Sequence, residues 1–200
     1  MSDEQARAAL MARIEDAVST RMREKRRRWQ HTQGVADTAE ELARAYGADP
    51  FSARAAGLLH DWDKVLPDAE LAARAAAYGI CVEGPISKAV HLLPGPVAAH
   101  ELPNLFPELD PSVFQAVARH TVGATDMTPL DMVVYVADAI EPGRGPYADV
   151  LRSQVGETSL EGLFLACAAQ SMSYVIQERR YLYPPAVAVY NAYLERAGAR

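Results

Sequence analysis

The chain has little cysteine and no long apolar run. Only Cys81 and Cys167 occur among its 200 residues; one disulfide is conceivable, but two such residues are more typical of buried thiols in a reducing compartment. No apolar segment approaches the ~20 residues that cross a bilayer, and the first residues lack the apolar stretch of a signal peptide. We therefore expect a cytoplasmic protein that does not span a membrane.

The charge balance and the missing phosphate-loop motif exclude further classes. Asp and Glu outnumber Lys and Arg by 26 to 20, for a net charge of −6, which argues against broad nucleic-acid binding. The basic run at 21–29 is more typical of a solvated helix face. The sequence contains no GxxxxGK loop and no serine or cysteine nucleophile motif. A small polyanionic substrate stays compatible, because one local basic pocket suffices to bind it.

The spacing of apolar residues, with Gly and Pro at the breaks, predicts helices throughout. The expected helices are 3–28, 31–46, 50–62, 68–78, 96–102, 111–121, 128–140, 159–178 and 184–197. Five Gly and Pro residues interrupt 80–97, which predicts a loop with at most a short helix. We therefore predict a single all-α domain over 1–200, with a core at about 28–145 and the terminal helices packed on it.

One run could be mistaken for a strand. Residues 132–136, MVVYV, are rich in β-branched side chains, but Asp131 and Asp138 flank them at heptad spacing within a helical pattern. We interpret this segment as a buried helix.

Several polar side chains are expected to point inward from separate helices. His31 begins one apolar stripe, His60 and Asp61 end the most apolar helix, and His120 and Asp138 continue two further apolar patterns. Hydrogen bonds among these groups could satisfy them, but a metal ion would do so better, because a buried unpaired carboxylate is costly. Mixed histidine and carboxylate ligands inside a helical bundle suit Mn, Fe, Co, Ni or Zn better than Mg or Ca.

Three basic residues are candidates for phosphate binding. Lys64 follows the His-Asp pair by about one helical turn, and we expect it to act in catalysis as well. Arg144 lies in EPGR, just after the helix of Asp138, and a guanidinium forks onto phosphate oxygens. Arg28 precedes His31 by three residues. Each of them could instead be a solvated charge or pair with an acid.

The order His, His-Asp, Asp resembles the HD superfamily of metal-dependent phosphohydrolases. The strings RWQHTQGVADTAEELARAYGAD, AGLLHDWDKVLPDAEL, ARHTVGA and YVADAIEPGR are similar to the YqeK family of symmetrical diadenosine tetraphosphate hydrolases. The similarity runs from about Arg28 to Arg144, and more weakly through 186–193. It implies an HD-domain helical bundle that binds a small dinucleoside polyphosphate and hydrolyses it, through a metal-bound hydroxide, to two ADP.

The resemblance also implies a dinuclear site that often contains iron. His31, His60, Asp61 and Asp138 would hold the first metal, and Asp61 would bridge to the second. His120, in HTVG, would be a ligand of the second metal. Asp61 and Lys64 are then the expected catalytic residues.

One position departs from the family pattern. The family usually has a second-metal histidine directly before Gly-Pro-Val, and this chain has Pro94 there. Proline cannot ligate a metal through its side chain. His91 could take the role if 92–94 is a short insertion, and we prefer it as the remaining ligand. A lost ligand is the next interpretation, and His100 is the last.

Two other functions stay open. The chain could be an HD phosphohydrolase that acts on another nucleotide through one metal, as loss of the second-metal histidine would favour, or a nucleotide-binding domain whose catalysis has decayed. Tyr135, Tyr181 and Tyr183 could stack on an adenine or simply belong to the core. The apolar C-terminal helices could form the face of a homodimer.

Overall fold

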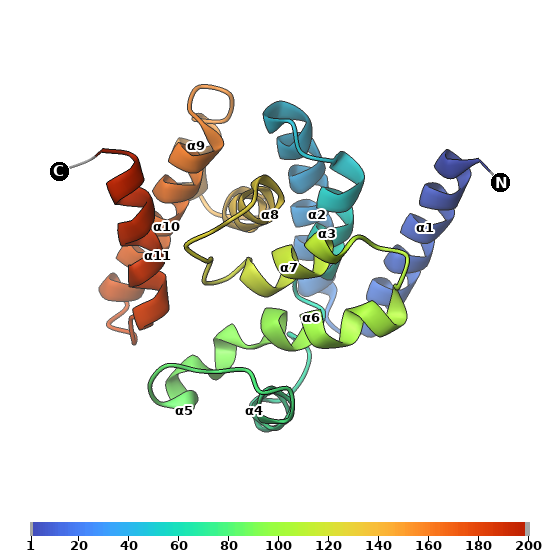
Figure 1. Ribbon diagram of the computed structural model, residues 1–200, viewed down its shortest axis with the longest axis horizontal. Helices are drawn as coiled ribbons and strands as arrows, with labels where there is room; N and C mark the ends of the chain where they lie inside the picture. The colour runs from blue at the N-terminus through green and yellow to red at the C-terminus, as the bar shows by residue number, and fades with distance from the viewer. Residues whose placement is uncertain (1, 199–200) are drawn as a thin grey trace.

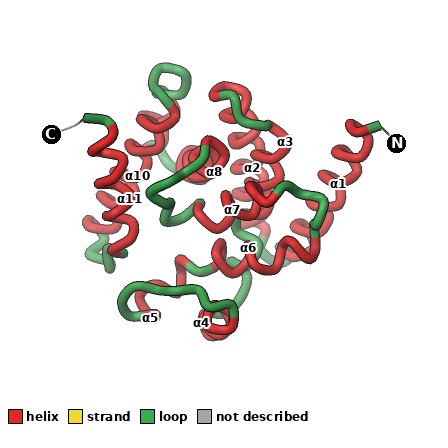
Figure 2. Tube along the Cα trace, in the orientation of Figure 1, coloured by secondary structure: helices red, strands yellow, loops and turns green. Residues whose placement is uncertain are grey.

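Helices and the turns between them account for residues 2–198, the part of the chain that this computed structural model describes, and no strand occurs there (Figure 2). The prediction of an all-α fold is confirmed. The helices are α1 (Asp3–Arg21), α2 (Arg26–Tyr46), α3 (Pro50–Leu59), α4 (Asp68–Ala77), α5 (Ile86–Ala89), the 3-10 turn η1 (Val90–Leu92), α6 (Pro94–Leu105), α7 (Pro111–Arg119), α8 (Pro129–Ile140), α9 (Tyr147–Arg152), α10 (Leu160–Gln177) and α11 (Pro184–Arg196).

Polar caps followed by proline set several helix starts. The Asp49 side chain accepts a hydrogen bond from the Ser52 amide at the start of α3, and Thr128 forms a capping box with Asp131 at the start of α8. Each helix then begins with a proline, whose missing N–H costs nothing at that position. These caps fix where the two helices that lead to the candidate site begin.

The predicted helix over 3–28 was wrong at its C-terminal end. The chain turns after α1, where the amide of Lys25 donates to the carbonyl of Met22 over 2.7 Å. No glycine or proline marks this turn; burial of Met22 against α2, where its sulfur accepts from Thr32, explains it. His31 consequently lies in the second turn of α2 rather than at the start of a helix.

The segment expected to be mostly loop, 80–97, carries more helix than predicted. It holds α5, η1 and the first turn of α6, since proline is tolerated in the first turn of a helix. The short helix α9 was not predicted, because six residues are too few to show helical periodicity. The remaining predicted helices agree with the structure within a few residues.

Helix α8 lies at the centre of the fold. It packs against α2, α3, α7, α9 and α10, and Figure 1 shows it nearly end-on between α2 and α3 on one side and α10 and α11 on the other. Every residue of 130–137 is buried, which explains why the MVVYV run shows no polar face. A smaller apolar cluster joins α4, η1 and α6 below this main core.

No helix among residues 2–198 is long and apolar enough to cross a membrane. Helix α10, which precedes the last helix α11, exposes Tyr174 and Ile176 to solvent, by 50% and 61%. The homodimer face expected on these helices stays a prediction.

Candidate metal centre

Helices α2, α3, α7 and α8 bring histidine and carboxylate side chains together at one point. His31 comes from α2 and Asp138 from α8, while His60 and Asp61 directly follow α3 and His120 directly follows α7. Two groups of side chains place their donor atoms within 4.8 Å of one another. One group is His31, His60 and Asp138; the other is His60, Asp61 and His120. His60 belongs to both.

The shortest distances in this cluster join atoms that can ligate a metal. The Nε2 atom of His31 lies 3.1 Å from the Asp138 carboxylate and 3.3 Å from Nε2 of His60. Nε2 of His60 lies 3.4 Å from the Asp61 carboxylate. His60, Asp61 and His120 are buried, and His31 is nearly so. Asp138 is the more exposed member, with 24% of its side-chain surface accessible.

Backbone carbonyls hold the other nitrogen of two of these rings. Nδ1 of His60 donates to the carbonyl of Gly57 over 2.7 Å, and Nδ1 of His120 donates to that of Val117 over 2.8 Å. Because a carbonyl only accepts, the proton lies on Nδ1 and the lone pair of the neutral ring lies on Nε2. The Nε2 atom of His120 accepts from the hydroxyl of Thr121 over 2.8 Å.

Glu141 holds the third ring. Its carboxylate accepts from Nδ1 of His31 over 3.0 Å, so the Nε2 lone pair of a neutral His31 also faces the cluster. The centre is therefore made of converging acceptors, namely two Nε2 atoms with the carboxylates of Asp61 and Asp138. Acceptors cannot hydrogen-bond to one another, and a cation bound among them would be attracted by all four. This donor set fits a divalent metal of the N/O-binding type.

The electrostatics of the two carboxylates agree with that arrangement. Burial acts to raise the pKa of Asp61, but His60, His120 and Arg28 outweigh it and hold that pKa well below its usual range. The pKa of Asp138 is likewise lowered despite burial, by the neighbouring His31, His60 and Arg144. Both groups therefore stay ionised and available to a cation.

The histidine pKa values move in opposite directions. Burial and the neighbouring His60 lower the pKa of His120, which favours its neutral, ligating form. Burial also acts to lower the pKa of His60, but Asp61 and Asp138 outweigh it and raise the net value.

Two of the three expected phosphate-binding residues lie directly on these carboxylates. Arg28 donates to Asp61 over 2.5 Å. Arg144 donates from Nε to the backbone carbonyl of Asp138 over 2.6 Å. Its terminal nitrogen donates to the side-chain carboxylate of Asp138. Both side chains keep about a third of their surface exposed, so they can also meet a ligand.

Lys64, the third of these residues, contacts neither carboxylate; its ammonium donates to the backbone carbonyl of His91 over 2.9 Å. The imidazole of His91 is exposed and joins neither donor group. Partial burial of the ring and the neighbouring Lys64 lower the pKa of His91. His100 is stacked on Tyr78, with ring centroids 5.1 Å apart, and also lies outside the cluster.

The segment that carries Pro94 does reach the cluster. A Cβ on Gly95 would lie 2.9 Å from the ring of His120 and 2.5 Å from the carbonyl of Val117. Only glycine permits this close approach of α6 to α7. Position 94, where a histidine was expected, is thus one residue from a contact with His120, while His91 belongs to neither donor group.

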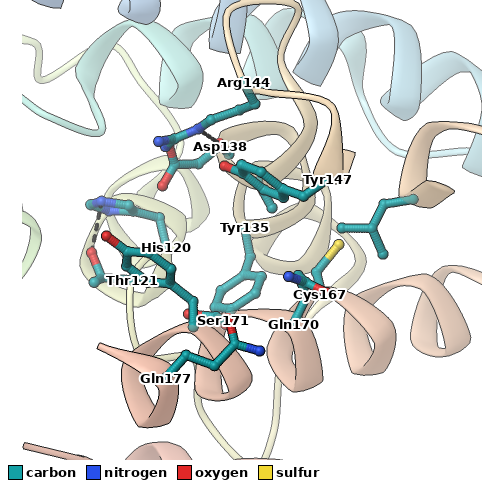
Figure 3. Close-up of a pocket in the computed structure, with 13 residues that line it drawn as sticks. His120, Thr121, Tyr135, Asp138, Arg144, Tyr147, Cys167, Gln170, Ser171 and Gln177 are labelled. Carbon is teal, nitrogen blue, oxygen red and sulfur yellow. Dashed lines mark hydrogen bonds and ion pairs between the residues drawn. The ribbon is translucent and has the colours of Figure 1, made fainter. Parts of the chain in front are cut away.

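A cavity of about 570 Å³ opens beside the cluster, between α8, α9 and α10. Its charged side chains are Asp138 and Arg144, and its α10 wall is uncharged (Figure 3). The lining residues are His120, Thr121, Tyr135, Asp138, Ala139, Arg144, Tyr147, Leu151, Cys167, Gln170, Ser171, Tyr174 and Gln177. Of the three tyrosines considered above, only Tyr135 lines it; Tyr183 instead accepts from the amide of Glu83.

The helical fold and these side chains define an all-α protein with a candidate histidine–carboxylate metal centre. The family model of the HD domain matches residues 28–143, and the chain belongs to that family.

Proteins of known name and structure resemble most of the chain. A protein of Halalkalibacterium halodurans is 31% identical, over 84% of this chain and 89% of its own length, and one of Bacillus subtilis is 32% identical, over 82% and 88%. Both are named symmetrical bis(5'-nucleosyl)-tetraphosphatase. A crystal structure from Clostridium acetobutylicum, described as a predicted HD superfamily hydrolase involved in NAD metabolism, superposes with a TM-score of 0.83 at 30% identity, covering 92% of this chain and 96% of that one.

Proposed function

We propose that this protein is a metal-dependent hydrolase that cleaves diadenosine tetraphosphate into two ADP. The observation that carries the proposal is the convergence of three imidazoles and two carboxylates next to Arg28 and Arg144, beside a cavity. The choice of diadenosine tetraphosphate as the substrate follows the relatives that resemble most of the chain, which are named symmetrical tetraphosphatases.

In this proposal His31, His60, Asp61 and Asp138 hold a first metal ion, and His120 with Asp61 serves a second. Iron is the ion we expect, with Mn, Co, Ni and Zn as alternatives. When bound, such ions lower the pKa of a water molecule toward ~7 and neutralise phosphate charge. The protein contributes fixed ligand orientations, because its imidazoles are held through their Nδ1 atoms.

The basic residues and the cavity would place the substrate. Arg144 lies between the cluster and the cavity, so its guanidinium can turn a phosphate toward the centre while a nucleoside fills the space beyond it. Tyr147 and Tyr174 are flat surfaces on which a base can stack. Lys64 is half-buried beside His91, where its ammonium can meet the second half of a long polyphosphate.

A hydrolase that works through one metal ion is the second candidate. Pro94 and the exposed position of His91 favour it, because both leave the second metal with fewer ligands. Such an enzyme would act on a different nucleotide, such as a nucleoside monophosphate. A nucleotide-binding domain without catalysis is the third.

One assay separates the three. The purified chain, loaded in turn with Fe²⁺, Mn²⁺, Co²⁺, Ni²⁺ or Zn²⁺, is incubated with diadenosine tetraphosphate, or with a nucleoside monophosphate, in water enriched in ¹⁸O. Products are resolved by chromatography and mass spectrometry, and binding of each nucleotide is measured by calorimetry. From diadenosine tetraphosphate we expect ADP alone, with one ¹⁸O per pair of ADP molecules. ATP with AMP would contradict symmetrical cleavage. Turnover of nucleoside monophosphates only would favour the one-metal enzyme, and binding without turnover would favour the third candidate.

A further inference from the structure

Among residues 2–198, Glu141 is the one buried carboxylate that contacts the cluster without belonging to either donor group. It directly follows α8, and its side chain is 5% exposed. We propose that Glu141 is a positioning residue that fixes the ring of His31 and thereby sets the metal affinity of the centre. This inference rests on the proposed role of His31 as a metal ligand.

Each carboxylate oxygen of Glu141 has its own donor. Oε1 accepts from Nδ1 of His31 over 3.0 Å, and Oε2 accepts from the amide of Gly143 over 2.5 Å. The carboxylate therefore cannot rotate away from the ring without losing the second hydrogen bond. A charged acceptor on Nδ1 keeps the proton there and makes Nε2 a stronger ligand.

Two glycines make room for this carboxylate. A Cβ on Gly34 would lie 2.7 Å from Oε2, and a Cβ on Gly143 would lie 2.8 Å from Oε1. Gly34 follows His31 by three residues and so lies one turn further along the same face of α2. The HTQG and EPGR strings therefore pack against each other. The first supplies the ring of His31 and the glycine Gly34, and the second supplies the carboxylate of Glu141 and the glycine Gly143.

Residues at the C-terminal end of α8 contact both ring nitrogens of His31. Asp138 faces Nε2 at 3.1 Å and Glu141, three residues later, faces Nδ1 at 3.0 Å. The backbone of Glu141 is held in turn, because its carbonyl accepts from Arg152 over 2.6 Å. The His31 ring orientation therefore depends on where α8 ends, which is a constraint on metal binding and not only on packing.

The test compares Glu141→Gln with Asp131→Asn. Asp131 is also a buried carboxylate, but it lies at the opposite end of α8, where it accepts hydrogen bonds from Arg119 and Gln115. Affinity for Mn²⁺ alone is measured by competition with a chelator, on protein whose folding is checked by circular dichroism. Loss of such an outer partner costs about 10–100-fold in metal affinity. We expect that loss in Glu141→Gln and unchanged affinity in Asp131→Asn.

Equal Mn²⁺ affinity in Glu141→Gln and the unsubstituted chain overturns the inference, as does an equal loss in the Asp131 control. Should Glu141→Gln fail to fold, Gly34→Ala displaces the carboxylate while retaining it, and the same loss is expected. Nitrogen NMR of labelled histidine in the metal-free chain gives a readout independent of metal: the proton of neutral His31 should lie on Nδ1, and a mixture of tautomers should appear in either variant.

The variant His31→Ala separates this inference from the proposed ligand set. If His31→Ala binds Mn²⁺ as the unsubstituted chain does, both the ligand role and the inference fail. If His31→Ala loses affinity but Glu141→Gln does not, only the inference fails. None of these outcomes depends on turnover of a nucleotide.

Discussion

Nε2 of His31 and Nε2 of His60 face each other across 3.3 Å. The hydrogen bonds of their Nδ1 atoms, to Glu141 and to the carbonyl of Gly57, turn both lone pairs toward this gap. Two acceptors at this distance repel unless a cation lies near both. The fold holds them there because α2 and α3 pack against each other and α8 packs against both.

Removing Asp61 should therefore abolish metal retention with little loss of fold. In Asp61→Ala the cluster loses a carboxylate 3.4 Å from Nε2 of His60, while Arg28, whose side chain is 37% exposed, can turn to solvent. We expect no turnover of diadenosine tetraphosphate and at least tenfold less bound metal by elemental analysis, with an unchanged circular dichroism spectrum. The control is Asp37→Ala, an exposed carboxylate on α2 that pairs with Arg54. Normal metal content in Asp61→Ala would show that Asp61 is not a ligand.

Arg144→Lys should weaken catalysis even though the positive charge is kept. The guanidinium donates to both the carbonyl and the carboxylate of Asp138, and an ammonium is a single point charge that cannot keep both contacts and orient a phosphate. We expect kcat/KM to fall about 10–100-fold, or ~1.4–2.8 kcal/mol. Arg44→Lys, an exposed arginine paired with Glu40, should leave kcat/KM unchanged. Equal kcat/KM values for Arg144→Lys and Arg44→Lys would contradict a role of Arg144 in substrate binding.

The sequence was sufficient to predict the helices and the converging histidines, because burial repeats with the helical period. It could not predict the turn after α1, since the burial of Met22 depends on a distant packing partner and carries no local signal. It also missed Glu141, which follows an apolar helix as an ordinary surface acid would. Gly34 and Gly143 were the available signal, but only the folded chain shows that both make room for the same carboxylate.

The cavity wall on α10 was also beyond the sequence. No sequence motif marks the α10 residues of this wall, which are Gln170, Ser171, Tyr174 and Gln177. Only the packing of α10 on α8 places them in the same cavity lining as Asp138. The exposed position of His91 depends in the same way on the path of η1, which no pattern in the sequence fixed.

Cys167 should resist alkylation at a pH where Cys81 reacts. Burial raises the pKa of the Cys167 thiol from 9.0 to about 12, whereas Cys81 is exposed. Only the thiolate is nucleophilic, so at pH 8.5 we expect iodoacetamide to label Cys81 alone, as read by peptide mass spectrometry. Cys81 is the internal control, and denaturant should make both residues reactive. Equal labelling rates in the native protein would contradict a buried, protonated Cys167.

The same shift predicts how stability changes in alkali. Above about pH 9 the unfolded chain releases the Cys167 proton, while the folded chain keeps it until about pH 12. The folded state therefore binds more protons in this window, and the free energy of unfolding should fall as pH rises through it. Cys167→Ala should show a weaker decline than the unsubstituted chain in denaturant titrations between pH 8 and pH 10.5. An identical slope in the two proteins would exclude this contribution.

Pro94→His tests the departure at the second metal. Position 94 begins α6 one residue before Gly95, whose backbone approaches the His120 ring so closely that a Cβ there would lie 2.9 Å from it. A histidine at 94 would add an imidazole where proline offers no ligand. The N–H that it brings needs no partner within the helix, because the first N–H groups of a helix have none. We expect the bound metal per chain, measured by elemental analysis on folded protein, to rise.

His91→Ala is the matched variant. The exposed imidazole of His91 joins neither donor group, so its removal should leave metal content unchanged. A loss of metal in His91→Ala, together with no gain in Pro94→His, would mean that the loop over η1 rearranges to bring His91 into the centre. The opposite pair of results would mean that this chain has one complete metal site beside an incomplete one, and that a single residue, Pro94, separates it from the two-metal arrangement.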